Sequence, residues 1–236
     1  MQSTFYRNLI ILLLCMVSGI VDVIGYLQLG HVFTANMTGN IIIMGMALGH
    51  LHTVSLMRSG AAFVGFIIGN AAGTLFLGRS HPGSVWSSRM TMIISVQLVF
   101  FLLFAWLSSA PLVPAMEYTL IILLSLTMGM QTTMARKLAV AGISTTVLTN
   151  NLASVIEDLV THMRQWFGRS SADQRRRLST DTVLRFAAVV IYGAGAVVAA
   201  LIEESHTLLG IWIPIVIMVI ILGIAYARFR HSATSR

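Results

Sequence analysis

Six apolar runs dominate the sequence, and each is about as long as a membrane span. A helix of about 17–20 apolar residues crosses a hydrocarbon core of roughly 30 Å. Of the 236 residues, 56% are hydrophobic and 10% are charged, whereas soluble proteins average about 25% charged. The sequence therefore predicts an all-α integral membrane protein, with a single transmembrane domain over residues 1–236. The expected spans are 9–29, 60–77, 91–108, 117–135, 184–203 and 209–227.

Two polar blocks interrupt this apolar sequence, and they share one pattern. Residues 34–40 read Thr-Ala-Asn-Met-Thr-Gly-Asn, and residues 145–151 read Thr-Thr-Val-Leu-Thr-Asn-Asn. Both fit Thr-x-x-x-Thr-(Gly/Asn)-Asn. The apolar pieces that follow, 40–50 and 151–162, would rise only about 16–18 Å as helices, which is roughly half a bilayer. Such repeated polar interruptions predict two re-entrant half-helices and a solute or ion site beside them.

The basic residues test this topology. If each short piece leaves the membrane by the same face through which it entered, fourteen of the 15 Lys and Arg residues lie on one side of the membrane. Arg58 alone then lies on the other side. The positive-inside rule then predicts that both termini and the loop 164–183 are cytoplasmic. The net charge of +7 does not indicate a nucleic-acid partner, because these residues flank apolar spans.

The order of segments predicts an inverted repeat. Each half reads span, short piece, span, span, and three crossings reverse the direction in which the second half enters. The predicted repeats cover about 1–110 and 111–236. Such repeats place the starts of two half-helices tip to tip near the midplane, where irregular backbone must be buried or must line a cavity.

The chain also resembles a known family over nearly its whole length. The resemblance is carried by residues 19–22 (Gly-Ile-Val-Asp), 29–33 (Leu-Gly-His-Val-Phe) and 35–40 (Ala-Asn-Met-Thr-Gly-Asn), and the stretch from Gly129 to Asn151 is similar too. These motifs look like those of the YoaK family, a bacterial inner-membrane family of unknown function with about six spans. The resemblance implies a multi-pass protein of the bacterial inner membrane and names no substrate.

The candidate solute-binding residues lie where the two short helices should begin. A helix N-terminus carries about half a positive charge and free N–H donors, which suit an anion or a neutral polar solute. Thr and Asn are also good N-caps, so a purely structural role is the alternative. The predicted binding residues are Thr38, Gly39, Asn40, Thr149, Asn150 and Asn151.

Asp22 is the main candidate for coupling or gating. A carboxylate within a span costs roughly 2.5–3.5 kcal/mol and is a functional candidate by default. The alternative is a structural carboxylate bonded to nearby backbone. In the second half Asp22 aligns with Thr132, beside Gln131, so we expect the coupling chemistry to be asymmetric.

Two further candidates flank the first polar block. His31 precedes it and is either a gate or proton relay or a structural histidine. Asn70 lies among Gly65, Gly69 and Gly73, whose four-residue spacing favours close helix packing, an interface between repeats or a homodimer. Asn70 could also reach the first polar block.

These features favour a small transporter or channel for a small polar or anionic solute or an ion. A membrane-embedded enzyme acting on a lipid or quinone is one alternative, for which only His31 and Asp22 are suitable. A scaffold or accessory subunit built on the glycine faces is another. The sequence contains no phosphate-binding loop, nucleophile elbow, zinc-protease motif or dinucleotide fingerprint, so we expect no enzyme activity, no cofactor and no metal.

Overall fold

The computed structural model describes residues 2–49, 55–78, 86–111, 113–138, 148–167 and 180–229, and the regular structure in these ranges is helical. Six helices are long and apolar enough to cross a membrane, and they correspond to the six predicted spans. They are α1 (Gln2–Gln28), α3 (Leu56–Leu77), α4 (Ser88–Leu107), α5 (Pro114–Lys137), α7 (Thr180–Ser205) and α8 (Trp212–Phe229). A short 3-10 turn, η2 (Leu209–Ile211), precedes α8. The protein is therefore a multi-pass, all-helical membrane protein.

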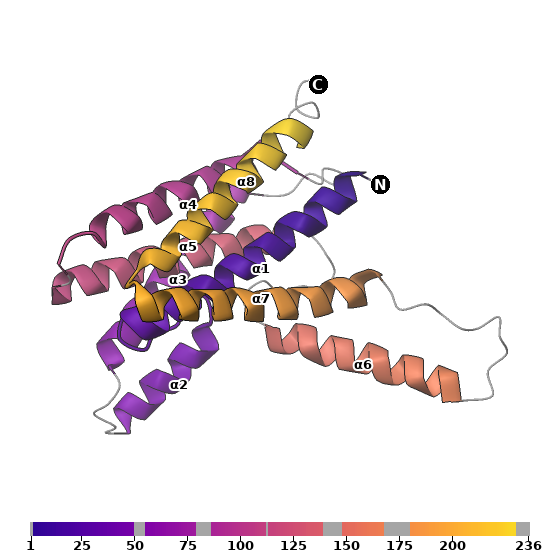
Figure 1. Cartoon of the computed structure of the whole chain (residues 1–236), viewed down its shortest axis with the longest axis horizontal. Helices are drawn as coiled ribbons and strands as arrows, with labels where there is room; N and C mark the ends of the chain where they lie inside the picture. Colours follow the sequence, from indigo (N-terminus) through magenta and orange to yellow (C-terminus); the bar gives the residue numbers. More distant parts are fainter. Residues whose placement is uncertain are drawn as a thin grey trace.

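The six long helices run along one common direction (Figure 1). α1 begins and α8 ends at the same end of the bundle, whereas α4 ends and α5 begins at the opposite end. α5 runs against α1, α7 runs against α3, and α8 runs against α4 in this view. This arrangement agrees with an even number of crossings.

Two helices lie outside this set of spans. α2 (Met37–Leu48) has 12 residues, close to the predicted piece 40–50. α6 (Leu148–Phe167) has 20 residues and is longer than the predicted piece 151–162. In Figure 1 the two helices lie on the same side of the bundle and extend toward opposite ends.

The extra length of α6 has a physical reason. Its apolar run ends at Val160, but the polar residues that follow do not stop a helix. Asn151 and Val155 are buried, and the carboxylate of Asp158 accepts a hydrogen bond from Thr182 of α7. A second face exposes Leu152, Ile156, Leu159, Val160 and Met163. α6 is thus anchored to α7 at Asp158, and the residues after Val160 up to Phe167 include no glycine or proline that would end a helix.

The closest helix contacts are made through glycines. A methyl group at Gly69 of α3 would overlap the carbonyl oxygen of Leu126 in α5, and one at Gly129 of α5 would overlap the carbonyl oxygen of Phe66 in α3. Small residues allow backbones in membranes to approach this closely, and the contact replaces the hydrophobic driving force that lipid cannot supply. The glycine face of α3 is therefore used inside the chain.

α1 and α7 approach each other in the same way. A methyl group at Gly19 of α1 would overlap the carbonyl oxygen of Tyr192, and one at Gly195 of α7 would lie 2.6 Å from the carbonyl oxygen of Met16. α3 with α5 and α1 with α7 are the two most extensively packed helix pairs.

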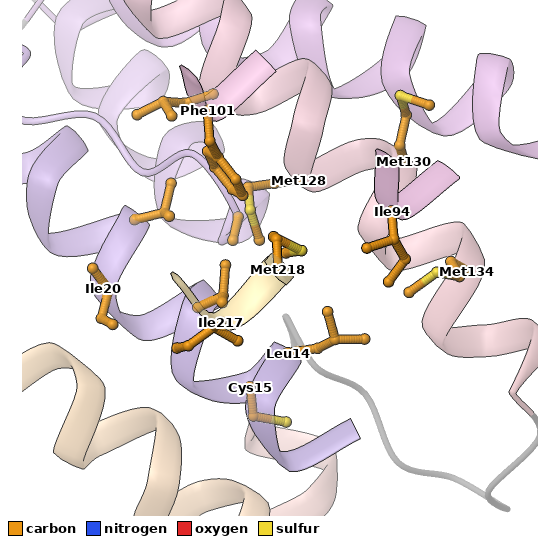
Figure 2. Close-up of a cluster of buried hydrophobic side chains, with 14 of the residues drawn as sticks. Leu14, Cys15, Ile20, Ile94, Phe101, Met128, Met130, Met134, Ile217 and Met218 are labelled. Atoms are coloured by element: carbon orange, nitrogen blue, oxygen red, sulfur yellow. The ribbon is translucent and has the colours of Figure 1, made fainter. Parts of the chain in front are cut away.

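The remaining core lies between α1, α4, α5 and α8. Figure 2 shows Leu14 of α1, Ile94 and Phe101 of α4, Met128 of α5 and Met218 of α8 in one buried cluster. Its side chains are almost entirely apolar, and the flexible methionines fill the gaps between branched and aromatic neighbours. Any polar group inside this core consequently needs its own partner.

Candidate functional site

The carboxylate of Asp22 lies at the centre of the first polar block. Its Oδ1 accepts hydrogen bonds from the backbone N–H groups of Thr34 at 2.8 Å, Ala35 at 2.6 Å and Asn36 at 3.3 Å. Its Oδ2 accepts from the hydroxyl of Tyr192 at 2.7 Å. All four partners donate, which matches the acceptor-only character of an ionised carboxylate. Asp22 thus ties the loop before α2 to α1 and α7.

Tyr192 was not among the residues expected from the sequence. It lies on α7, 170 residues after Asp22, and no local pattern connects the two. The only available signal was general: a hydroxyl within a span needs a partner, and a buried carboxylate needs donors. Its position opposite Gly19 explains the contact, because the close approach there brings α7 to the face of α1 that carries Asp22.

Asn40 closes the same loop from the other side. Its Nδ2 donates to the carbonyl oxygen of Phe33 at 2.5 Å, and its Oδ1 accepts from the N–H of Phe33 at 2.9 Å. The ring of Phe33 covers Gly39, where a methyl group would lie 2.6 Å from the ring. Thr38 is exposed and Asn40 is fully buried. The predicted residues therefore do lie in the first turn of α2, and Asn40 has a structural partner there.

The N-terminus of α2 has a mixed electrostatic character. Its N-cap residue, Asn36, provides no side-chain hydrogen bond to the first turn. Free N–H donors at such a position attract polar or negative groups. The carboxylate of Asp22 lies one hydrogen bond away, on the N–H of Asn36. Negative charge is thus already present, and a further anion would be repelled.

The second polar block occupies the equivalent place on α6. Residues 145–147 lie outside the described residues, and α6 begins at Leu148. Thr149 and Asn150 are exposed, whereas Asn151 is fully buried. The two blocks thus share one burial pattern: Thr38 and Thr149 are exposed, whereas Asn40 and Asn151 are buried.

Gln131 joins α5 to α1. Its Nε2 donates to the carbonyl oxygen of Leu14 at 3.1 Å and to the hydroxyl of Ser18 at 2.9 Å. Ser18 lies one turn before Asp22 on α1, so Gln131 contacts the same face of α1. The neighbouring Thr132, which aligns with Asp22, donates within its own helix to the carbonyl oxygen of Met128.

The other two predicted residues lie away from this contact. Asn70 lies at the contact of α3 with α5, where its carbonyl oxygen accepts from the hydroxyl of Thr133 at 3.1 Å. His31 is exposed, has a left-handed backbone with φ of 63°, and packs edge-on against Tyr26 with 5.0 Å between ring centroids. The structure therefore brings Asp22 and Gln131 to one face of α1.

Gln97 is a buried polar residue that the sequence reasoning missed. It lies halfway along α4, is fully buried, and neither atom of its amide has a hydrogen-bond partner. An isolated glutamine within an apolar span was the available signal. Within the described ranges, no group of three or more His, Cys, Asp or Glu side chains is placed to hold a metal ion.

Comparison with known proteins agrees with the membrane architecture. The family model described as "Protein of unknown function (DUF1275)" matches residues 10–224. The chain is 44% identical over 219 residues to the "UPF0700 transmembrane protein YoaK" of Bacillus subtilis (strain 168), which covers 92% of this chain and 93% of that protein. No solved structure matches. The chain belongs to the DUF1275 family, to which the resemblance of its first polar block already pointed.

Proposed function

We propose that this protein is a small transporter or channel of the bacterial inner membrane, built from two inverted halves, that carries a small neutral polar solute and has no enzyme activity. The inverted repeat is the part of the proposal that the structure supports most strongly. In known inverted-repeat transporters the solute binds at the interface of the halves.

The single observation that carries the proposal is a correspondence between the glycine contacts. Gly19 and Met16 of α1 lie 110 residues before Gly129 and Leu126 of α5, and each pair makes the same contact with its partner helix. On the partner helices, Phe66 and Gly69 of α3 lie 126 residues before Tyr192 and Gly195 of α7. This correspondence supports a relation between the halves in which α1 matches α5 and α3 matches α7.

The burial pattern supports the same exchange. Buried residues of α1 correspond to buried residues of α5 at the same separation of 110 positions. The pairs include Ile10 with Leu120, Ile11 with Ile121, Leu14 with Leu124, Cys15 with Ser125, Asp22 with Thr132 and Ile24 with Met134. α1 and α5 run in opposite directions, which supports an inverted relation between the halves (Figure 1).

The two polar blocks follow this relation as well. Asn40 lies 111 residues before Asn151, and both are fully buried near the start of a helix that is not a span. In Figure 1, α2 lies toward the end where α1 ends and α6 toward the end where α7 begins. This supports entry of the two helices from opposite faces. We propose that the solute contacts Thr38, Gly39, Thr149 and Asn150 where the helix starts face each other.

The carboxylate beside α2 favours a neutral solute over an anion. Asp22 already uses the three backbone donors that precede α2, and its negative charge opposes a second anion at the same place. We further assign Asp22 a coupling role. A proton on this carboxylate would turn one acceptor into a donor, weakening its hold on the loop, while the second half carries only the uncharged Thr132.

Flux into proteoliposomes tests the proposal. Stopped-flow light scattering measures vesicle swelling with glycerol or urea, and chloride and phosphate serve as anionic comparisons. The proposal predicts faster swelling than in empty vesicles for at least one neutral solute, and no acceleration for the anions. Protein-containing vesicles that match empty ones for every solute would favour the scaffold alternative.

A further inference from the structure

Two glutamines inside the bundle have amide atoms without partners. Gln97 and Gln131 are both fully buried. Neither amide atom of Gln97 has a hydrogen-bond partner, and neither does Oε1 of Gln131. The orientation of Gln131 is fixed, because its Nε2 faces the carbonyl oxygen of Leu14, which only a donor can satisfy. Buried polar groups are nearly always paired, so three unpaired amide atoms in one core require an explanation.

The two glutamines belong to the same neighbourhood. Gln97 lies one turn from Ile94 and from Phe101 on the buried face of α4, and Gln131 lies one turn from Met128 and from Met134 on α5. In Figure 2, Phe101 is drawn near Met128 and Ile94 near Met134, and α4 packs against α5. Gln97 and Gln131 thus both lie on the buried faces of two helices that pack against each other.

A line of polar groups connects this neighbourhood with the first polar block. Gln131 donates to the hydroxyl of Ser18, and Ser18 lies one turn from Asp22 on α1. Asp22 in turn holds the loop that leads into α2. The unpaired Oε1 of Gln131 thus lies at the inner end of a line of polar residues that begins at the loop before α2.

We infer that Gln97, Gln131 and Ser18 form a binding site for a small uncharged molecule that both donates and accepts hydrogen bonds. The inference rests on the proposed transport function, because it assigns the site a place on the same solute route. Gln97 offers two N–H donors, and the Oε1 atoms of both glutamines offer acceptors.

The surroundings select against ions. Phe101, one turn from Gln97, and Met128, one turn from Gln131, belong with Met218 to the buried apolar cluster of Figure 2. An ion there would lose its hydration without gaining a counter-charge from the three binding residues. A small amide or polyol would lose less hydration free energy than an ion, and it would form hydrogen bonds with the unpaired amide atoms.

Cysteine accessibility tests the site without knowledge of the natural solute. Gln97→Cys, Gln131→Cys and Ser18→Cys are each made in the full chain with Cys15→Ser, and each variant is reconstituted into proteoliposomes. The probe is 2-hydroxyethyl methanethiosulfonate, which is small, neutral and polar, and labelling is followed by intact mass. Methanethiosulfonates react with the thiolate, which forms only where water or a polar solute reaches the thiol.

The wild-type chain supplies the control. Its own Cys15 lies three residues before Ser18 on α1 and is fully buried. We expect the three introduced cysteines to react at least about tenfold faster than Cys15. Ser18→Cys is nearly isosteric, so it carries the test if a glutamine variant fails to fold.

Three results are decisive. Fast labelling at these positions supports the site. Labelling no faster than that of Cys15 overturns the site, and the transport proposal then stands if the wild-type chain transports a neutral solute. Fast labelling alongside a wild-type chain that transports no solute supports the site and contradicts the transport proposal.

Discussion

The hydroxyl of Tyr192 on α7 donates to Oδ2 of Asp22 on α1 at 2.7 Å, and this bond joins the two halves of the chain. Tyr192→Phe removes the hydroxyl and keeps the ring. We expect the free energy of unfolding to fall by about 1–2 kcal/mol, because Asp22 keeps its three backbone donors. Thermal unfolding in detergent measures the loss. Tyr26→Phe is the control, because its ring stacks on Phe33 with or without the hydroxyl.

A second prediction concerns coupling at Asp22. Asp22→Asn keeps the shape of the side chain and an acceptor oxygen for the loop, but it cannot titrate. We expect the pH dependence of solute flux to disappear while the affinity for the solute is retained. Flux measured as a function of pH, in the wild-type chain and in Asp22→Asn, checks this. A transport-competent Asp22→Asn protein with unchanged pH dependence would refute the coupling role.

A third prediction compares two glycines on one helix. Gly195→Ala places a methyl group 2.6 Å from the carbonyl oxygen of Met16, whereas nothing lies within 4 Å of a methyl group at Gly193. Overpacking against a backbone costs about 1–3 kcal/mol or more. We expect Gly195→Ala to lower the unfolding temperature and Gly193→Ala to leave it unchanged or raise it slightly. Equal effects of the two changes would contradict the close contact of α1 with α7.

A fourth prediction separates structure from binding at Asn40. Asn40→Leu leaves the N–H and carbonyl of Phe33 without their partner, and each unpaired group costs about 1–3 kcal/mol. We therefore expect reduced thermal stability. Flux per folded molecule decides the remaining question. If the flux per folded molecule is normal, Asn40 only holds the loop. If this flux is abolished, Asn40 also belongs to the solute route.

The spans were predictable from sequence because each requires only a long apolar run. The predicted span 91–108 became α4 (Ser88–Leu107), and 60–77 became α3 (Leu56–Leu77). The length of α6 was not predictable in this way. Its second half mixes polar and apolar residues without a glycine or proline, and Asp158 anchors the helix on α7. Such an anchor is invisible in a local apolar pattern.

The site was predictable in part. Asp22 and residues of the first polar block were each predicted as functional candidates because they are polar within a membrane sequence, and the structure joins Asp22 to this block by hydrogen bonds. The partner Tyr192 and the unpaired amide of Gln97 were missed. Tyr192 is brought in by a contact across 170 residues, and Gln97 is a single polar residue whose isolation appears only once its neighbours are known.

The transport proposal depends on the inversion of the two halves, and the sidedness of three serines tests this inversion directly. Ser3→Cys, Ser109→Cys and Ser235→Cys, each with Cys15→Ser, sample the start of the first half, its end beside the second half, and the end of the second half. The measurement is labelling by a membrane-impermeant maleimide in intact and permeabilised bacterial cells. The account predicts that only Ser109→Cys reacts in intact cells and that all three react after permeabilisation. Labelling of Ser109→Cys and Ser235→Cys from the same side would mean an even number of crossings in the second half, and would contradict the inverted repeat.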